Sequence, residues 1–541
     1  MRIAQLLAVP RPRLICTALL VASLMEMAGC GAPGNGANDG AATLIVGRGG
    51  EAESLDPIHI ETGEAVKVVV NLYDTLVAYD EETIDLVPGL AREWETSDDG
   101  LRWTFHLREG VRFHDGTPLD ADAVVFSFNR LIVDDNPHAH SGIMPYAPAY
   151  DVIEAVRAVD PLTVEFTLKN PSAVFLANLA MFSAGIVSPT AVEQEGADFA
   201  THPVGSGPFR FVRWTRDQEL ILAANEDYWD APPGVDRLIF IPVIESAVRV
   251  AQLRRGEIHI ADNLPPAEVN VLADDADIAV QTTPGMNLAY LAIQNERPPL
   301  DNVKLRRAIA HAIDKKALID VAYDGSAQPA VNPLPMTMWS WDDSISDRPY
   351  DVERARELVE EAAAESGFAL PLDLSLYVMA SPRPYMQQPM ETAVFIKEAL
   401  KPIGINVRIV TNEIGQHFQR LGRGEYDLGL AGWSTDNCDP DNFLYQLLDE
   451  DNINDLGGNN NCRYRSAAVH ERLLAAQQEL DRDRREQLYR EAQELIFADA
   501  PMVPLVHSDV RLALRGDVKG FHLHPTALFR LRRAELARPT P

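Results

Sequence analysis

Hydrophobic and polar positions alternate with two different periods along the chain, and each period predicts a different element. Apolar residues recur at every second position in 103–107 and 162–168, which is typical of half-buried strands. In 120–131 they recur at intervals of three to four, after an aspartate, Asp120, that is suited to cap a helix. We therefore expect two strands and an intervening amphipathic helix in this part of the chain.

Further along, segments with the helical period are separated by short apolar segments of strand type. The strand-type segments are 43–47, 374–378 and 407–410, and the helical segments are 302–319, 351–364, 389–400, 466–479 and 484–498. Alternation of strands and helices favours an α/β fold with predominantly parallel strand pairing. With 541 residues, the chain is long enough for about two to four domains.

The N-terminus has the layout of an export signal. Three arginines precede an apolar stretch at 14–25, which is shorter than the roughly 20 residues that a membrane-spanning helix needs. Small residues then precede Cys30, as in a bacterial lipobox, in which the cysteine is lipidated and becomes the mature N-terminus. We expect a lipoprotein signal peptide at 1–29 and a flexible tether at 30–42. An ordinary secretory signal with a chance cysteine is the alternative.

Two cysteines, Cys438 and Cys462, remain once the signal peptide and Cys30 are set aside. A disulfide is chemically permitted in an exported protein, and the loop that it closes would stabilise the fold by roughly 3 kcal/mol. We predict a disulfide between these two residues, with a pair of free buried thiols as the alternative.

The balance of charges excludes some classes of partner. The chain has 48 Lys and Arg against 80 Asp and Glu, which gives a formal net charge of −32. A surface this acidic repels phosphate backbones, so we expect no nucleic-acid partner. The hydrophobic share of 46% excludes an intrinsically disordered chain in spite of this charge.

No motif in the chain supports catalysis. The glycines in 29–34 fit the dinucleotide-binding pattern, but they follow a signal peptide instead of a strand. The sequence has no phosphate-binding loop and no nucleophile elbow, and its histidine pairs, 138/140 and 522/524, lack the spacing of a zinc protease. We therefore expect neither an enzyme nor a cofactor or metal site. A secreted hydrolase is the alternative from another class of function.

Several short motifs become specific when their order and spacing are taken together. They are ESLDP at 53–57, YDTL at 73–76, LVPGLA at 86–91, FHDG at 113–116, PVGSGPF at 203–209, YW at 228–229 and VKLRRAI at 303–309. Through these motifs the chain, over about 43–530, resembles family 5 of the extracytoplasmic solute-binding proteins of ABC importers. The resemblance is greatest to the dipeptide-binding members of that family.

Two further motifs of the resemblance concern the ligand: PRPY at 382–385 and GWSTDNCDPDNF at 432–443. The resemblance implies that Arg383 pairs with a peptide carboxylate and that Asp436 holds the peptide ammonium group. It also implies that the ligand is lined by Pro384, Tyr385, Trp433, Ser434 and Thr435. A planar guanidinium matches a carboxylate through two hydrogen bonds. Opposed charges at a fixed separation would then select a dipeptide by its length.

One segment departs from the family pattern. The dipeptide-binding members have a threonine-rich stretch that touches the ligand, and the resemblance places Glu61, Thr62 and Gly63 at the corresponding positions, so we expect these three residues in the site. Glu61 and Glu64 replace neutral residues of that stretch. A glutamate facing the site would favour a ligand with extra positive charge or repel a carboxylate.

The resemblance implies a two-lobed α/β architecture. It is the periplasmic-binding-protein-like II fold (Venus-flytrap, cluster C), with an extra subdomain in the large lobe. The large lobe is expected at 43–288 and 508–541, with the extra subdomain at about 83–203, and the small lobe at 289–507.

The expected function is capture and delivery of peptides. We expect an exported, lipid-anchored monomer that faces the periplasm or the cell exterior. It would bind peptides, foremost dipeptides, by closure of its lobes and pass them to the permease subunits of an ABC importer in the membrane. Longer oligopeptides, a nickel chelate, haem or a sugar are the alternative ligands.

Overall fold

The computed structural model describes residues 41–140, 142–454 and 458–537. Ala42–Pro541 forms one compact unit. The predicted signal peptide, Cys30 and the predicted tether as far as residue 40 lie outside the described residues. None of the helices in the described ranges combines the length and the apolar composition needed to cross a bilayer.

One mixed sheet of twelve strands extends through the whole unit, in the order β16-β15-β17-β13-β18-β11-β1-β10-β9-β8, with β12 and β14 also paired to β18. Its strands are β1 (Thr43–Arg48), β8 (Phe209–Thr215), β9 (Glu219–Ala224), β10 (Arg237–Pro242), β11 (Ile260–Ala261), β12 (Ile278–Pro284), β13 (Asn287–Ile293), β14 (Ala327–Pro329), β15 (Leu372–Met379), β16 (Ile405–Asn412), β17 (Leu428–Ser434) and β18 (Met502–Arg515).

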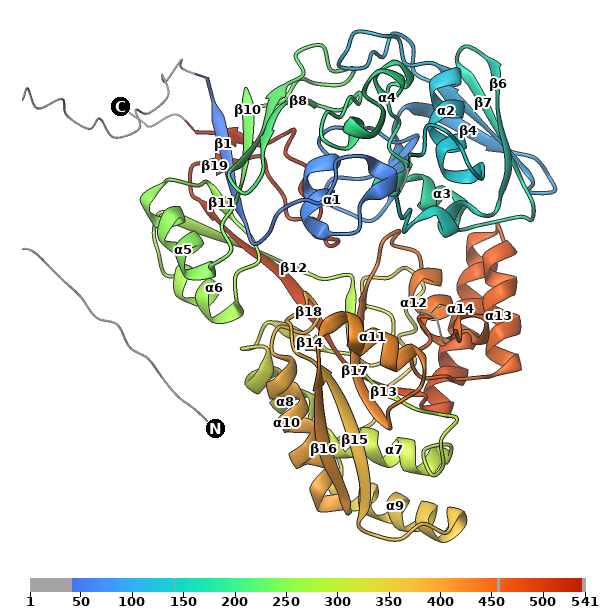
Figure 1. Cartoon of the computed structure of the whole chain (residues 1–541). Helices are drawn as coiled ribbons and strands as arrows, with labels where there is room; N and C mark the ends of the chain where they lie inside the picture. Colours follow the sequence, from blue (N-terminus) through green and yellow to red (C-terminus); the bar gives the residue numbers. More distant parts are fainter. Residues whose placement is uncertain (1–40, 141, 455–457, 538–541) are drawn as a thin grey trace, which may run out of the picture. The chain divides into compact units, whose positions relative to one another are not determined.

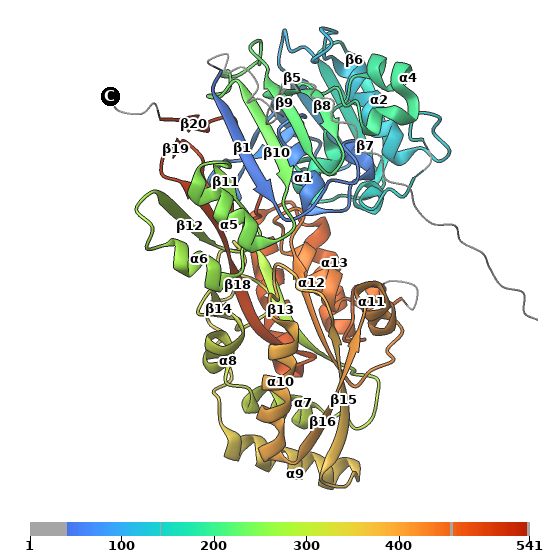
Figure 2. The same ribbon diagram turned by 60° about the vertical axis from the view of Figure 1, so that its left-hand side comes forward.

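The unit has the expected two lobes, which Figures 1 and 2 show above and below a narrower middle. Strands β1 and β8–β10 and helix α1 (Gly63–Val69) belong to the large lobe, and β15–β17 to the small lobe. The antiparallel neighbours β13 and β18 connect the two. The lobe boundaries expected near 288 and 508 fall within or beside these strands, and they stay a prediction.

A separate four-stranded sheet builds the extra subdomain of the large lobe, in the order β4-β5-β7-β6. Its strands are β4 (Ala91–Thr96), β5 (Arg102–Leu107), β6 (Ile153–Asp160) and β7 (Thr163–Leu168), and α2 (Ala121–Ile132) packs on β6 and β7. The alternating and helical patterns at 103–107, 162–168 and 120–131 are thus confirmed. The side chain of Asp120 caps α2 by accepting from the amide of Ala123 at 3.2 Å.

Three of the sequence motifs meet at one half-buried carboxylate, that of Asp74. It accepts hydrogen bonds from Ser206 Oγ at 2.8 Å, from the hydroxyl of Tyr228 at 2.8 Å and from Trp229 Nε1 at 3.1 Å. Burial raises the pKa of Asp74. The carboxylate of Asp74 therefore joins these three segments of the large lobe, since a carboxylate withdrawn from water needs such donors.

Strand pairing differs from the prediction. The parallel pairs are β1–β10, β1–β11, β15–β16 and β15–β17, and the other pairs among the described strands are antiparallel. The prediction of predominantly parallel pairing was therefore wrong. Short connections such as 216–218 between β8 and β9 make antiparallel hairpins. The prediction was based mainly on the helix-rich second half of the chain, whereas this hairpin lies in the first half.

The helix predicted at 302–319 is two helices, α7 (Val303–Ala312) and α8 (Lys315–Ala322). Ile313 has an extended backbone, with φ −100° and ψ 110°. The carboxylate of Asp314 accepts from the amides of Lys316 and Ala317 at 3.0 and 3.1 Å. An aspartate that caps a helix interrupts the apolar period only slightly, so the pattern did not reveal the break.

The other predicted helices and strands are confirmed to within two residues at most ends. The helices are α9 (Val352–Ser366), α10 (Pro389–Leu400), α13 (Ala467–Gln478) and α14 (Arg482–Asp499). The remaining elements are α3 (Phe175–Leu179), α4 (Pro189–Glu195), α5 (Ser246–Arg255), α6 (Pro266–Leu272), α11 (Ile414–Gly422), α12 (Asp441–Leu448), β2 (Val77–Tyr79), β3 (Leu86–Pro88), β19 (Val518–Lys519) and β20 (Glu535–Leu536).

Candidate functional site

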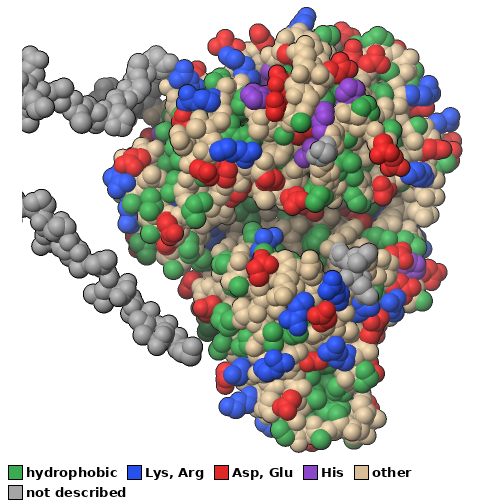
Figure 3. Space-filling model, viewed as in Figure 1, with side chains coloured by type: hydrophobic (Ala, Val, Ile, Leu, Met, Phe, Trp, Pro, Cys, Tyr) green, Lys and Arg blue, Asp and Glu red, His purple; other side chains and the backbone are tan. Residues whose placement is uncertain are grey.

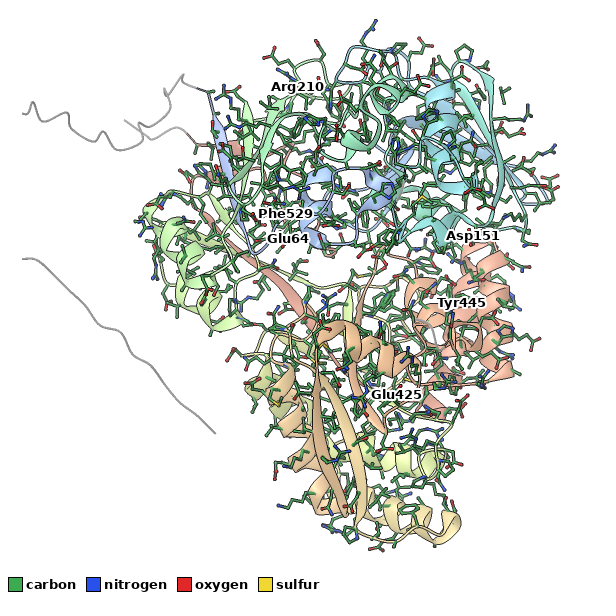
Figure 4. The ribbon with its side chains drawn as sticks, in the orientation of Figure 1. Glu64, Asp151, Arg210, Glu425, Tyr445 and Phe529 are labelled. Atoms are coloured by element: carbon green, nitrogen blue, oxygen red, sulfur yellow. The ribbon has the colours of Figure 1, made fainter. Side chains whose placement is uncertain are left out.

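A cavity of about 860 Å³ lies between residues of the two lobes. Figure 3 shows the surface hollowed at this level, and Figure 4 marks Glu64, a lining residue, on the face of the large lobe toward the small one. All ten residues expected in the site line this one cavity: Glu61, Thr62, Gly63, Arg383, Pro384, Tyr385, Trp433, Ser434, Thr435 and Asp436. The structure thus brings together segments from three distant parts of the chain, and the role of these residues in binding stays a prediction.

Arg383 lies in the loop that leaves β15 and enters α10. The loop is closed by a pair of backbone hydrogen bonds between Arg383 and Met386, at 3.0 and 2.8 Å. It is held in place from outside, because Ser508 Oγ donates to the carbonyl of Pro384 at 3.0 Å and the hydroxyl of Tyr323 donates to that of Tyr385 at 3.2 Å. Arg383 itself is exposed. Its guanidinium is therefore presented from a fixed loop into an open part of the cavity.

Asp436 lies two residues beyond the end of β17, in a turn that Asn442 organises. Asn442 Oδ1 accepts from Trp433 Nε1 at 2.9 Å and from the amide of Asp436 at 3.2 Å. The hydroxyl of Thr435 accepts from the amide of Cys438 at 2.9 Å. The polar residues of this motif thus shape the turn that carries the aspartate.

The carboxylate of Asp436 receives a hydrogen bond from the hydroxyl of Tyr146, at 3.3 Å. Burial raises the pKa of Asp436 to about 6, while the bond from Tyr146 acts in the opposite direction. The pKa of the Tyr146 hydroxyl is itself raised, first by burial and then by the negative charge of Asp436. A carboxylate in this position lacks a cationic partner among the described residues, and a ligand ammonium group would supply one.

The turn that carries Asp436 is fastened on both sides. Asn437 Nδ2 donates to Asn178 Oδ1 at 2.7 Å, and the hydroxyl of Tyr79 donates to the carbonyl of Asn437. Both partners belong to the large lobe. On the other side, Asp439 forms a buried two-pronged ion pair with Arg485 of α14, with both N–O distances at 2.7 Å. The carboxylate of Asp436 is therefore held in a rigid frame.

The predicted disulfide between Cys438 and Cys462 was wrong, because both residues are free cysteines. Cys438 is buried in the apolar cluster of the extra subdomain, with Leu76 and Tyr79. Cys462 is buried in a different cluster, with Tyr290 and Tyr426. Each thiol is thus a small apolar side chain in its own core.

The early segment of the site is arranged around Glu53. Its Oε1 accepts from the amides of Glu61 and Thr62 at 2.6 and 2.9 Å, and its Oε2 accepts from the hydroxyl of Thr62. Thr62 in turn caps α1. Glu64 Oε1, one turn further, contacts Lys67 Nζ at 3.1 Å and Asn263 Nδ2 at 2.7 Å. Both glutamates that replace neutral residues of the family pattern, Glu61 and Glu64, therefore face the cavity.

Several polar residues of the cavity could not be predicted from the sequence motifs. Asn287 at the start of β13 and Ser508 in β18 form three hydrogen bonds with each other, at 2.8, 2.9 and 3.0 Å. A polar residue that begins a fully buried strand was a signal that could have drawn attention to Asn287. Tyr146 gave no such signal, since it precedes a short 3-10 helix outside any periodic segment.

One group of side chains among the described residues has the spacing of metal ligands: Asp449, Asp451 and His470. His470 Nδ1 lies 3.0 and 3.1 Å from the two carboxylate oxygens of Asp449, and this contact raises the pKa of the imidazole. None of the three lines the cavity. An ion pair accounts for the arrangement.

Comparisons of the sequence with a family profile and with individual known proteins indicate the same family. The sequence profile described as "Bacterial extracellular solute-binding proteins, family 5 Middle" matches residues 85–455. A dipeptide-binding protein of Pseudomonas aeruginosa is 35% identical over 503 residues, which cover 90% of this chain and 93% of that protein. Heme-binding protein A of Haemophilus influenzae is 36% identical over 470 residues, covering 84% of this chain and 85% of the relative.

A solved structure shows the same fold with a ligand. The dipeptide-binding protein from Pseudoalteromonas sp. SM9913, in complex with Met-Leu, superposes with a TM-score of 0.78 at 30% sequence identity. The match covers 91% of this chain and 100% of that chain. The two-lobed fold therefore extends over nearly the whole chain.

Proposed function

The chain belongs to family 5 of the bacterial extracellular solute-binding proteins, and on that premise we propose that it captures short peptides, foremost dipeptides, for an ABC importer. Proteins of this family are extracytoplasmic binding proteins of transport systems and not enzymes. In the proposed function, the lobes close over the peptide and the protein delivers it to the permease subunits in the membrane. The protein acts as a monomer that is tethered to the membrane through a lipid on Cys30.

The observation that carries this proposal is the presence of Arg383 and Asp436 on the wall of one cavity. A free peptide is a zwitterion, with a carboxylate at one end and an ammonium group at the other. The guanidinium of Arg383 suits the carboxylate, and the half-buried carboxylate of Asp436 suits the ammonium group. Each charge-assisted hydrogen bond contributes roughly 1.5–3 kcal/mol to binding.

The neighbouring residues support the same assignment. Tyr385 and Trp433 supply aromatic surface to the cavity wall, and Pro384, Ser434 and Thr435 bring backbone or hydroxyl groups to it. Backbone groups can hold a peptide bond without selecting among side chains, which suits a protein that accepts many sequences. A cavity of about 860 Å³ leaves room for two side chains of different size.

The test begins with mass spectrometry of the ligand released from the purified protein, followed by calorimetry with Ala-Ala, Met-Leu, tri-Ala and haem. We expect dipeptides to bind tightest. Arg383→Ala and Asp436→Ala should each weaken dipeptide binding by roughly 10- to 100-fold. The matched controls are Arg408→Ala and Asp320→Ala, which change exposed residues outside the cavity.

Three results would count against the proposal. Wild-type affinity in both cavity variants would mean that Arg383 and Asp436 do not recognise the charged ends of the peptide. Tighter binding of haem or of the tripeptide than of any dipeptide would reassign the ligand. Cleavage of the peptide beyond the amount of protein present would favour the hydrolase alternative.

A further inference from the structure

We propose that Glu61 provides an unpaired negative charge at the ammonium end of the cavity, so that the protein prefers peptides whose first residue has a cationic side chain. This inference rests on the proposed function, since it assigns the ammonium group of the peptide to Asp436. It concerns the side chain of the first residue, which Asp436 itself does not contact in that assignment.

Glu61 lies at the same end of the cavity as Asp436. Both residues line the cavity together with Tyr146, whose hydroxyl donates to Asp436 at 3.3 Å. Burial and the charge of Asp436 raise the pKa of Tyr146 most, and the negative charges of Glu61 and Glu53 raise it further, so Glu61 and Asp436 act on the same hydroxyl. The carboxylates near Tyr146 differ, however, in their hydrogen-bond and ion-pair partners.

Among the carboxylates of Glu53, Glu61, Glu64 and Asp436, that of Glu61 has no bonded partner in the described part of the chain. Its backbone amide donates to Glu53 Oε1 at 2.6 Å, but its side chain is exposed and has no hydrogen-bond or ion-pair partner among the described residues. Glu53 accepts three hydrogen bonds from Glu61 and Thr62. Glu64 contacts Lys67 and Asn263. The charge of Glu61 is thus available to a ligand.

The cations of the cavity are engaged elsewhere. Lys67 forms ion pairs with Asp262 and Glu64. Arg511 donates to Ser326 Oγ at 2.5 Å, and its charge acts on its neighbour Asp509. Arg383 lies on the loop between β15 and α10, where the proposed function gives it the peptide carboxylate.

The net charge of the residues that line the cavity also favours a peptide with a cationic side chain. The described residues that line the cavity include four acids, Glu61, Glu64, Asp436 and Asp509, and three bases, Lys67, Arg383 and Arg511. A zwitterionic peptide neutralises one of each and leaves the excess of one negative charge unchanged. A peptide with a basic first residue removes this excess, whereas one with an acidic first residue increases it.

The test compares peptides that differ in one charge. Calorimetry with Lys-Ala and norleucyl-Ala compares side chains of similar length with and without the ammonium group, and Ala-Lys places the same charge at the other residue. In the wild type we expect Lys-Ala to bind roughly fivefold tighter than norleucyl-Ala, with a smaller gain for Ala-Lys. The gain should decrease as salt is added.

The variant Glu61→Gln should bring the ratio of the two dissociation constants close to one. The control Glu360→Gln removes an equal charge from the exposed face of α9 and should leave the ratio as in the wild type. An unchanged ratio in Glu61→Gln, or no wild-type preference for Lys-Ala, overturns the inference while dipeptide binding itself persists. If none of the peptides binds, the proposed function fails, and the preference fails with it.

Discussion

The hydroxyl of Tyr146 donates a hydrogen bond to Oδ1 of Asp436 at 3.3 Å, and the two residues are 290 positions apart in the chain. Tyr146 comes from the large lobe, and Asp436 follows β17 of the small lobe. The bond therefore connects the lobes through the residue that we propose as the ammonium-binding group.

Removal of this bond should make Asp436 harder to ionise. In Tyr146→Phe, the pKa of Asp436 should rise above its present value of about 6, because the hydrogen bond from Tyr146 lowers it. We expect dipeptide binding at pH 7 to weaken by roughly two- to tenfold. Tyr350→Phe, at an exposed tyrosine, is the control for calorimetry. Equal affinity in the two variants would show that the bond has no effect on binding.

Dipeptide affinity should depend on pH through Asp436. Its pKa in the free protein is about 6, and a bound ammonium group would lower it, so binding below pH 6 requires loss of a proton. The association constant should therefore be nearly constant from pH 7 to 7.5 and fall roughly tenfold from pH 7 to pH 5. No histidine is among the described residues that line the cavity. In Asp436→Asn we expect weak binding with no such slope, and a slope that survives the substitution would identify another group.

Gly432 is a position where any side chain would disturb the site. A β-carbon added there would lie 2.2 Å from the ring of Tyr385 and 2.6 Å from the carbonyl oxygen of Leu288. Gly432→Ala should displace Tyr385 and with it the loop of Arg383, which lowers both dipeptide affinity and the free energy of unfolding, the latter by about 1–3 kcal/mol. The control is Gly516→Ala, where the nearest atom would be at 3.4 Å. Calorimetry and thermal unfolding measure the two effects, and a wild-type result in both would contradict the predicted clash.

The ion pair between Asp439 and Arg485 should contribute strongly to stability. Both side chains are buried, at 6% and 7% exposure, so Asp439→Ala leaves a buried guanidinium without its partner. We expect the free energy of unfolding to fall by about 3–5 kcal/mol. Denaturant unfolding of this variant, of Arg485→Met and of the double variant measures the coupling. Additive losses would mean that the pair has no coupling energy.

The two thiols should be inert in the folded protein. Burial raises the pKa of both, that of Cys462 to about 12, so neither forms a reactive thiolate near neutral pH. Intact mass should not change on reduction, and iodoacetamide should modify Cys438 and Cys462 only after unfolding in guanidinium. A mass gain of two hydrogens on reduction would restore the predicted disulfide.

The sequence predicted the elements better than their pairing. Alternation at 103–107 and a capped helix at 120–131 depend on local burial, and both were found as β5 and α2. Hydrophobic periods do not encode the direction of a neighbouring strand, so predominantly antiparallel pairing was missed. They also did not reveal the break at Ile313, because its backbone changes direction while its side chain remains buried.

For the site, the resemblance to the family gave the residues of three short segments, two in motifs and one in a stretch that departs from the family pattern, and all of them line the cavity. The residues that support these segments from outside could not be predicted from the sequence. Tyr146, Asn178 and Ser508 contact the motifs across long distances in the chain, and nothing in their own surroundings indicates it. Whether Cys438 is free or in a disulfide could likewise not be predicted, because it depends on the apolar cluster against which its loop packs.

The pairing of β13 with β18 has a consequence for the gene as well as for the protein. Ala289 in β13 lies opposite Val506 in β18, beside the expected lobe boundaries near 288 and 508, so the chain enters and leaves the small lobe at adjacent positions. With the expected boundaries, residues 290–505 are a single contiguous insert whose ends meet across a sheet. One excision and one short turn would remove the insert, and an insert from a relative could be joined at the same two positions.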